Sequence, residues 1–419
     1  MTSSRDSRGS RAGWGLNRFV ASQEGDRVTT LELFFDLAFV FAFTQLSRLM
    51  AQQHDAWSVL EAMITLALLW WTWTAYGWLA NLAHADQGVV RVAMVIGMAA
   101  VFVAGVAVPE AYDDLAGGLS GPAVLVAAYL VARLTHAVVF VLLSTRPLRR
   151  RTLLTMACAV VPSGALLVTG VVLGSPWQVW CALAAVAVEP YVSYRTSTGV
   201  EWPIGSTTHF TERHGLIVIL ALGESILAIG VGVSAEPISV PILVGVVLSI
   251  AITVAMWSAY FTRLALPAEH ALSARRQGPR ARAATDGYTY LHLVLVAGIV
   301  LAALGLEVAM AHIEAAEPFG GFGGAALAGG VACYLAGTAL FARRVIGGWE
   351  PLRLAGAAVL VAGVPVVAAV PPMVALAVVC VALSVLLLLE RRAGAPAARV
   401  GPAPSRQPRA TPAATSGDR

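Results

Sequence analysis

Two carboxylates, Glu32 and Asp36, lie among phenylalanines in the apolar stretch TTLELFFDLAFVFAFTQL (29–46). A charge at the centre of a membrane-spanning helix costs about 2.5–3.5 kcal/mol on insertion scales, so such a group should face the interior of a helix bundle and meet a partner. Glu32 fits a capping box with Thr29, whose hydroxyl would accept from the first helical amides. Asp36 lies one turn deeper on the same face, where capping cannot explain it. It therefore needs a cationic partner or a proton.

Arg133 is a cation that such an acid could meet. Tyr129, Arg133 and His136 are spaced i, i+4 and i+7, which places them on one face of a helix, and Arg133 falls near the middle of the apolar run 122–144. A guanidinium does not lose its proton in proteins, so a carboxylate must come to it. The available partners are the acids within apolar runs: Asp36, Glu189 and Glu224.

Glu224 lies at the middle of the stretch HFTERHGLIVILALGESILAIGVG (209–232), between Gly223 and Ser225. Glycines would let a neighbouring helix approach this stretch closely. They are Gly215, Gly223, Gly230 and Gly232. Burial against such a helix disfavours a charged carboxylate, so Glu224 is a candidate proton carrier. The alternative is a structural ion pair between Glu224 and Arg133.

The polar segment EWPIGSTTHFTERHG (201–215) brings His209, Glu212 and His214 close together in sequence. His214 is five residues from His209, about 140° around a helix, so the three cannot share one face and no metal site is expected. The same residues, together with His84, could serve a membrane-embedded enzyme near the membrane surface.

The composition places the chain in a lipid bilayer. Of its 419 residues, 58% are hydrophobic and 12% are charged, and the mean hydropathy is +0.75. A soluble protein carries about a quarter charged residues. The net charge of +4 comes from arginine alone, in the tails and in short loops between apolar runs. This placement indicates membrane orientation and argues against nucleic-acid binding.

Apolar runs of about 20 residues can each form a membrane-spanning helix. Twelve are predicted, near 30–50, 57–82, 89–108, 122–144, 152–173, 176–194, 211–233, 240–265, 286–309, 323–342, 352–370 and 372–390. The expected fold is therefore an all-α polytopic membrane protein. Its expected divisions are a disordered cytoplasmic tail (1–27), two six-helix halves (28–195 and 196–392) and a second disordered cytoplasmic tail (393–419).

The arginines alternate between successive loops. With a cytoplasmic N-terminus, the segments TRPLRRR, ARRQGPRAR and FARRVIGGWEPLR fall in the cytoplasm together with both tails. The opposite loops, QQHDA, PEAYDDLAGG, GSP, SAEPIS and HIEAAEPFGGFG, contain no arginine. Cytoplasmic loops hold an excess of positive charge, so we expect a plasma-membrane protein with both termini in the cytoplasm.

The two halves show signs of an internal repeat. WTAYGWLANLA resembles WSAYFTRLALPA, which aligns Trp73 with Trp257 and Tyr76 with Tyr260. Weaker matches keep the same order: Leu31-Glu32 with Thr211-Glu212, Tyr129-Leu130 with Tyr334-Leu335, and Pro162 with Pro365. Six spans separate each pair, so the halves would be parallel repeats. Chance recurrence of common membrane residues is the alternative.

The second half would begin much as the first does. Thr207 or Thr208 is expected to cap its first helix, with Glu212 in the position that Glu32 holds in the first half.

Three segments resemble the bacterial low temperature requirement protein A family: TTLELFFDLAFVFAFTQL, WWTWTAYGWLAN with the following His84, and HFTERHGLIVILALGESILAI. The resemblance covers about residues 28–390, with the segments in the expected order, and it departs at His214, where the family has an aromatic residue. It implies a bacterial integral membrane protein loosely tied to growth in the cold. It brings no substrate, reaction or catalytic residue.

We expect a secondary transporter or an ion or proton pathway, because the deep ionisable groups lie where transport sites lie. Its pathway residues would be those predicted to face the bundle interior: Asp36, Arg133, His136, Glu224, Glu32, Glu189, Ser225 and Tyr76. The expected partners are the lipid bilayer and an unidentified small solute or ion, with no nucleic acid, cofactor, metal or catalytic residue. The alternatives are a membrane-embedded enzyme acting on a lipid or lipid-linked substrate, and a structural or sensory protein.

Overall fold

The computed structural model describes three stretches of the chain, and every regular element in them is helical. These stretches are residues 23–197, 204–234 and 236–394. Most of the two tails expected at 1–27 and 393–419 lies outside the described residues. The all-helical prediction is therefore confirmed for the part of the chain that the structure covers.

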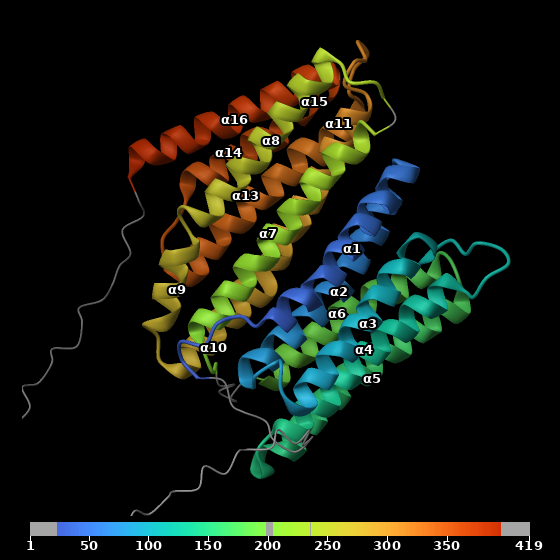
Figure 1. Cartoon of the computed structure of the whole chain (residues 1–419), viewed down its shortest axis with the longest axis vertical. Coiled ribbons are helices and arrows are strands. Elements are labelled where there is room, and N and C mark those ends of the chain that lie inside the picture. Colours follow the sequence, from blue (N-terminus) through green and yellow to red (C-terminus); the bar gives the residue numbers. More distant parts are fainter. Residues whose placement is uncertain (1–22, 198–203, 235, 395–419) are drawn as a thin grey trace, which may run out of the picture.

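Six long helices form the first half of the protein. They are α1 (Thr30–Gln53), α2 (Ala56–Leu82), α3 (Gly88–Ala107), α4 (Gly121–Leu143), α5 (Arg146–Leu173) and α6 (Trp177–Ser197), with a short turn η1 (Val108–Glu110) after α3. Figure 1 shows these helices gathered on one side of the molecule.

The second half contains more and shorter elements, several of which continue one another. They are α7 (Thr207–Gly232), α8 (Val240–Phe261), α9 (Ala265–Ser273), α10 (Gln277–Ala284), η2 (Thr285–Leu291), α11 (His292–Ala311), α12 (Gly320–Gly324), η3 (Ala325–Gly329), α13 (Gly330–Phe341), η4 (Ala342–Ile346), α14 (Pro351–Ala362), α15 (Val364–Ala369) and α16 (Pro372–Ala393). Figure 1 shows them on the other side, with α7 next to the first half.

Ten helical segments within the described residues are long and apolar enough to cross a membrane. The predicted spans at 176–194 and 352–370 are not among them. The first corresponds to α6, whose apolar run is interrupted by Glu189 and ends in a polar sequence. The second is divided at Gly363, which leaves α14 with 12 residues and α15 with 6. The chain is thus a multi-pass membrane protein, with ten candidate spanning helices in the part that the structure describes.

The helices of the two halves contact one another in the same order. In the first half, α1 contacts α2 and α3, α3 contacts α4, α4 contacts α2 and α5, and α6 contacts α5 and α2. In the second half, α7 contacts α8 and α11, α11 contacts α13, α13 contacts α8 and α14, and α16 contacts α14 and α8. Between the halves, α1 and α2 contact α7 and α11.

Local capping sets where α1 and α7 begin. The capping box of Thr29 and Glu32 is present as predicted, with Thr29 accepting from the Glu32 amide and donating its own amide to the Glu32 carboxylate. The prediction that Thr207 or Thr208 caps α7 is wrong. Ser206 caps it instead, because its hydroxyl lies 3.1 Å from the His209 amide and α7 begins at the next residue.

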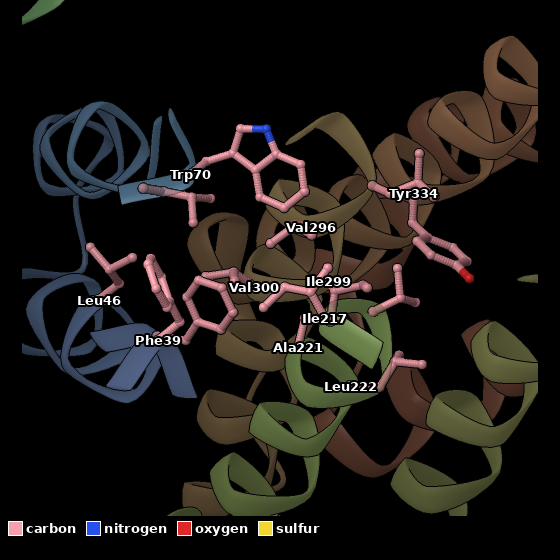
Figure 2. Packing of buried hydrophobic residues seen from close by; sticks show 14 of the residues in the cluster. Phe39, Leu46, Trp70, Ile217, Ala221, Leu222, Val296, Ile299, Val300 and Tyr334 are labelled. Atoms are coloured by element: carbon pink, nitrogen blue, oxygen red, sulfur yellow. The ribbon is translucent and has the colours of Figure 1, made fainter. Parts of the chain in front are cut away.

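A continuous apolar core joins the halves where α1 and α2 meet α7 and α11. Figure 2 shows Phe39 of α1, Ile217 and Ala221 of α7 and Val300 of α11 packed in this region. Large apolar side chains such as Val247 lie exposed on the outer helix faces, which matches a lipid environment.

Glycines lie at a close approach of α11 and α13, but two of the four glycines of α7 do not face another helix. A Cβ at Gly330 would lie 2.3 Å from the amide nitrogen of Ala302 on α11. By contrast, a Cβ at Gly223 or Gly230 would meet nothing within 4 Å, and only Gly232 of the α7 glycines would meet backbone closer than 3 Å. The prediction that the α7 glycines serve close packing is therefore wrong for Gly223 and Gly230.

This packing makes Gly330 intolerant of a methyl group. Gly330→Ala should lower the stability by about 1–3 kcal/mol or more, because the new Cβ would overlap the α11 backbone. Gly329→Ala is the matched control, since the adjacent glycine has open space around it. Thermal unfolding of the purified protein in detergent measures both. Equal melting temperatures for the two variants would contradict the close contact.

Candidate functional site

Two acids of α1 face a histidine and an arginine of α7. Glu32 Oε2 lies 2.9 Å from His209 Nε2 and accepts a hydrogen bond from Arg213 Nη1 at 2.5 Å. Asp36 Oδ1 lies 3.3 Å from Arg213 Nη2. All four side chains are at most 3% exposed. We call them the α1–α7 charge network: Glu32, Asp36, His209 and Arg213.

The network forms because both helices space their ionisable groups by four residues. Glu32 and Asp36 lie one turn apart on α1, and His209 and Arg213 lie one turn apart on α7. When the helices pack side by side, Glu32 and His209 meet at one level, and Asp36 and Arg213 meet one turn farther along. The bidentate geometry of a guanidinium lets Arg213 bridge both levels.

Trp73 of α2 extends the network toward the first half. Its Nε1 donates to Asp36 Oδ1 at 2.8 Å. The Arg213 guanidinium lies 5.5 Å from the centre of the Trp73 ring and 5.6 Å from that of Phe35, within the range of cation–π attraction. Asp36 Oδ2 and Arg213 Nε nevertheless have no hydrogen-bond partner. A buried oxygen left in this way costs about 1–3 kcal/mol, unless a proton or ligand satisfies it.

Asn81 favours one tautomer of His209. The Asn81 Oδ1 accepts the Gly205 amide at 2.9 Å, and its Nδ2 donates to the Ser206 carbonyl at 2.6 Å, so the orientation of the amide is set by backbone groups. The same Nδ2 lies 3.2 Å from His209 Nδ1. A donor there matches the tautomer of His209 in which Nδ1 accepts and the proton on Nε2 faces Glu32.

The charges of the network do not balance. Glu32 and Asp36 bring two potential negative charges, Arg213 brings one positive charge, and His209 in this tautomer brings none. The set is therefore neutral only when one carboxyl group holds a proton. Asp36 is the group with a free buried oxygen to hold it.

Arg133 does not meet Asp36 or Glu224. It pairs with Glu189 of α6, where Nε lies 2.9 Å from Glu189 Oε1 and Nη2 contacts the same oxygen. Tyr129 and Ser163 donate to the other oxygen of Glu189 at 2.6 and 2.9 Å. Glu189, not Glu224, is the partner of Arg133 because α4 and α6 both contact α2 inside the first half. Glu224 lies on α7 of the second half.

Two further predicted residues lie near this pair. Tyr76 donates to the carbonyl of Ala132, next to Arg133, at 3.0 Å. His136 is 4% exposed and packs against Tyr76 with the two rings tilted by 53° and their centres 5.7 Å apart. Tyr76 also contacts Phe35 of α1, so it lies between the Arg133 pair and the α1–α7 charge network.

Glu224 lies apart from both groups. It accepts a hydrogen bond from Thr44 of α1 at 2.6 Å. Ser225 is buried and its hydroxyl has no hydrogen-bond partner. The predicted pathway residues thus fall into three groups: the α1–α7 charge network, the Arg133–Glu189 pair, and Glu224 with Thr44.

The comparisons with known proteins place the chain in a family. The model of the bacterial low temperature requirement A protein (LtrA) family matches residues 27–388. The chain belongs to the LtrA family. A protein of Rhizobium meliloti (strain 1021), described as uncharacterized, is 30% identical over 301 residues, which cover 67% of this chain and 69% of that protein. No solved structure matches.

The residues of the enzyme alternative do not share a site in this LtrA protein. His84 pairs with Asp26 at 3.4 Å, Glu212 accepts the Val28 amide, and His209 joins the charge network. His214 turns to a different side, where its ring lies 5.0 Å from Trp73 and its Nδ1 contacts the carbonyl one turn earlier. The described residues contain no group of three or more His, Cys, Asp or Glu that could hold a metal ion.

Sequence reasoning missed Arg213 as the partner of the α1 acids. The available signal was the matching four-residue spacing in LELFFDL and HFTER, each of which brings two ionisable groups to one helix face. A second missed group is Arg353, which is fully buried and donates to Glu390 at 2.8 Å and to the carbonyl of Ala259 at 2.7 Å. It joins α14, α16 and α8 in the second half.

The segment before α1 covers the network at the start of α7. Glu24 accepts the Thr207 amide at 3.0 Å, and Ser206 donates to the carbonyl of Asp26 at 3.1 Å. Arg280 of α10 approaches Glu24 to 3.8 Å. These contacts cover the end of the charge network that lies nearest the N-termini of α1 and α7.

On the lipid-facing side of the same contact, α1 and α7 leave an apolar groove of about 300 Å³. Its lining residues are Leu33, Phe34, Leu37, Leu216, Ile219 and Leu220.

Breaking the Arg133–Glu189 pair should be costly. Arg133→Met should destabilise the protein by about 3–5 kcal/mol, because it leaves the Glu189 charge buried without a partner. The double variant Arg133→Met with Glu189→Leu should recover much of that loss, since no buried charge remains. Unfolding in detergent, analysed as a double-mutant cycle, measures the coupling. Additive effects of the two single changes would exclude the pairing, and Arg150→Met on the exposed side of α5 is the control.

Proposed function

We propose that this LtrA protein is a secondary transporter in which a proton on the α1–α7 charge network is coupled to movement of a small solute or ion. The observation that carries the proposal is the unbalanced charge of this network at the contact between the two halves. Gaining or losing one proton at Asp36 changes the attraction between α1 and α7. A change in that contact is the kind of local event that alternates access in transporters built from two halves.

The same proposal includes twelve spans in two parallel repeats, 28–195 and 196–392. The supporting observation is that the helices of the two halves contact one another in the same order. In this pairing α1 corresponds to α7, α2 to α8, α3 to α11, α4 to α13, α5 to α14 with α15, and α6 to α16. Repeats that follow in parallel are related by an axis along the membrane normal. The protein would lie in the plasma membrane with both termini in the cytoplasm, as the arginine distribution favours.

The Arg133–Glu189 pair is proposed as the part of the pathway inside the first half. It lies near the middle of α4, at the depth where transporters bind their solutes. Beside it, a cavity of about 10 Å³ is lined by Tyr129, Thr65 and Thr72 among other residues. That volume holds about one water molecule, so a larger solute requires a more open conformation.

Transport is favoured over enzymatic activity because the ionisable groups are buried between helices. The residues that an enzyme would use at the membrane surface, His84, Glu212 and His214, face separate surroundings. The charge network also lacks a hydroxyl or thiol nucleophile paired with its histidine.

The twelve-span arrangement predicts that α6 crosses the membrane. In a variant without native cysteines, Ser175→Cys before α6 and Arg195→Cys near its end should lie on opposite sides. An impermeant thiol reagent applied to intact cells should label Ser175→Cys, and it should label Arg195→Cys only after permeabilisation. Labelling of both positions from the same side would exclude α6 as a span.

The coupling role predicts that Asp36→Asn abolishes proton-coupled flux. In proteoliposomes with a pH gradient, movement of protons together with solute should fall at least about tenfold, because the neutral amide cannot gain or lose the proton. Glu212→Gln is the matched control, since this acid lies one residue before Arg213 but outside the network. Full proton-coupled flux in Asp36→Asn would reject the mechanism. Turnover of a lipid substrate in detergent without any gradient would favour the enzyme alternative.

A further inference from the structure

A third acid of the α1–α7 contact, Glu224, lies farther along the same pair of helices. Glu224 follows Arg213 by eleven residues on α7, which is about 16 Å along the helix axis. Phe39, Phe43 and Ile217, all buried, lie between these two levels. The contact between the halves therefore contains two groups of ionisable side chains, the charge network and Glu224, with apolar side chains between them.

Glu224 is buried without a cationic partner. It is 1% exposed. Among the residues that the structure describes, no arginine or histidine forms an ion pair with it. Two charged groups act on it from the neighbouring helices, Arg48 of α1 and Glu307 of α11. Arg48 acts on Glu307 as well, so its single positive charge is shared between two acids.

The hydroxyl group of Thr44 supplies Glu224 with a hydrogen bond but no positive charge. Thr44 Oγ1 donates to Glu224 Oε2 at 2.6 Å and lies 3.2 Å from the carbonyl of Val40, one turn earlier on α1. Buried charges are otherwise paired with an opposite charge, and a neutral hydroxyl does not provide one.

Ser47 supplies no charge either. It lies one turn beyond Thr44 on α1, is 1% exposed and has its hydroxyl beside the Glu224 carboxyl group. The two groups of α1 that face the carboxyl group are therefore neutral hydroxyls. A buried carboxyl group that lacks an ion pair favours its neutral, protonated form.

We propose that Glu224 holds a proton in this conformation, accepts a hydrogen bond from Thr44 Oγ1, and forms with Thr44 and Ser47 a second proton site farther along the α1–α7 contact. The O–H bond of the carboxyl group forms when Glu224 takes a proton from the water on its side of the membrane, and it breaks when the proton returns there. The coupling ion is thus the proton, with no metal cation required. The protonation itself stands on the contacts above, and only its coupling role rests on the proposed function.

Infrared spectroscopy of the purified wild-type protein tests the protonation directly. The carbonyl stretch of a protonated carboxylic acid should be present at pH 7, and Glu224→Gln should remove it. Thr44→Val should keep the band but shift it, because the hydrogen bond that Thr44 donates to the acid is lost. Asp36→Asn is the control for a band from the charge network, and the Glu224 band should survive it. Glu224→Gln should also melt at the wild-type temperature, since the amide mimics the neutral acid.

Two results would overturn the proposal. The first is a band unchanged in Glu224→Gln. The second is a melting temperature that sodium ions raise in the wild type but not in Glu224→Gln, which would make the site a metal-cation site. The transport assay separates this proposal from the proposed function. Loss of the band in Glu224→Gln together with unchanged flux in Asp36→Asn would leave the proton site standing and the transport mechanism rejected.

Discussion

The arrangement of this protein depends on the cost of placing a charge in a low-dielectric interior without a partner. Each buried arginine of the described chain that occupies the bundle interior is matched to an acid on another helix: Arg213 to Glu32 and Asp36, Arg133 to Glu189, and Arg353 to Glu390. In each case the pair joins helices that are distant in sequence. Because the lipid offers no alternative partner, these pairs decide which helices can be neighbours, and apolar packing then fills the space between them.

The α1–α7 charge network differs from the other two pairs in its location and its composition. The Arg133–Glu189 pair lies inside the first half and is electrically balanced, and the Arg353 pair lies inside the second half. The network alone of the three joins the halves, and it contains one acid too many. A balanced pair holds a bundle together, whereas an unbalanced one makes the strength of the contact depend on a proton.

Much of the fold followed from the sequence because apolar runs and helix periodicity are local properties. The helices, the capping box of Thr29 and Glu32, and the inward orientation of Asp36 could be predicted in this way. The pairing of charges could not, since periodicity fixes which face a residue occupies but not which helix lies opposite. Arg133 was therefore placed correctly on its helix face, but the sequence did not decide which of Asp36, Glu189 and Glu224 it meets. The prediction of close helix packing at Gly223 was wrong for the same reason, because a glycine permits close packing only where another helix is present.

The groove beside the charge network has a consequence for how readily α1 and α7 can shift. Protein interiors are packed as densely as molecular crystals, so two helices sealed by interdigitating side chains resist sliding. Leu33, Phe34 and Ile219 line an apolar groove that leaves one side of the α1–α7 contact open toward the acyl chains. Hydrocarbon tails are fluid and can reshape around moving helices without a repacking cost. If the proposed change of protonation moves α1 against α7, lipid in this groove would adapt to the movement more easily than packed side chains would.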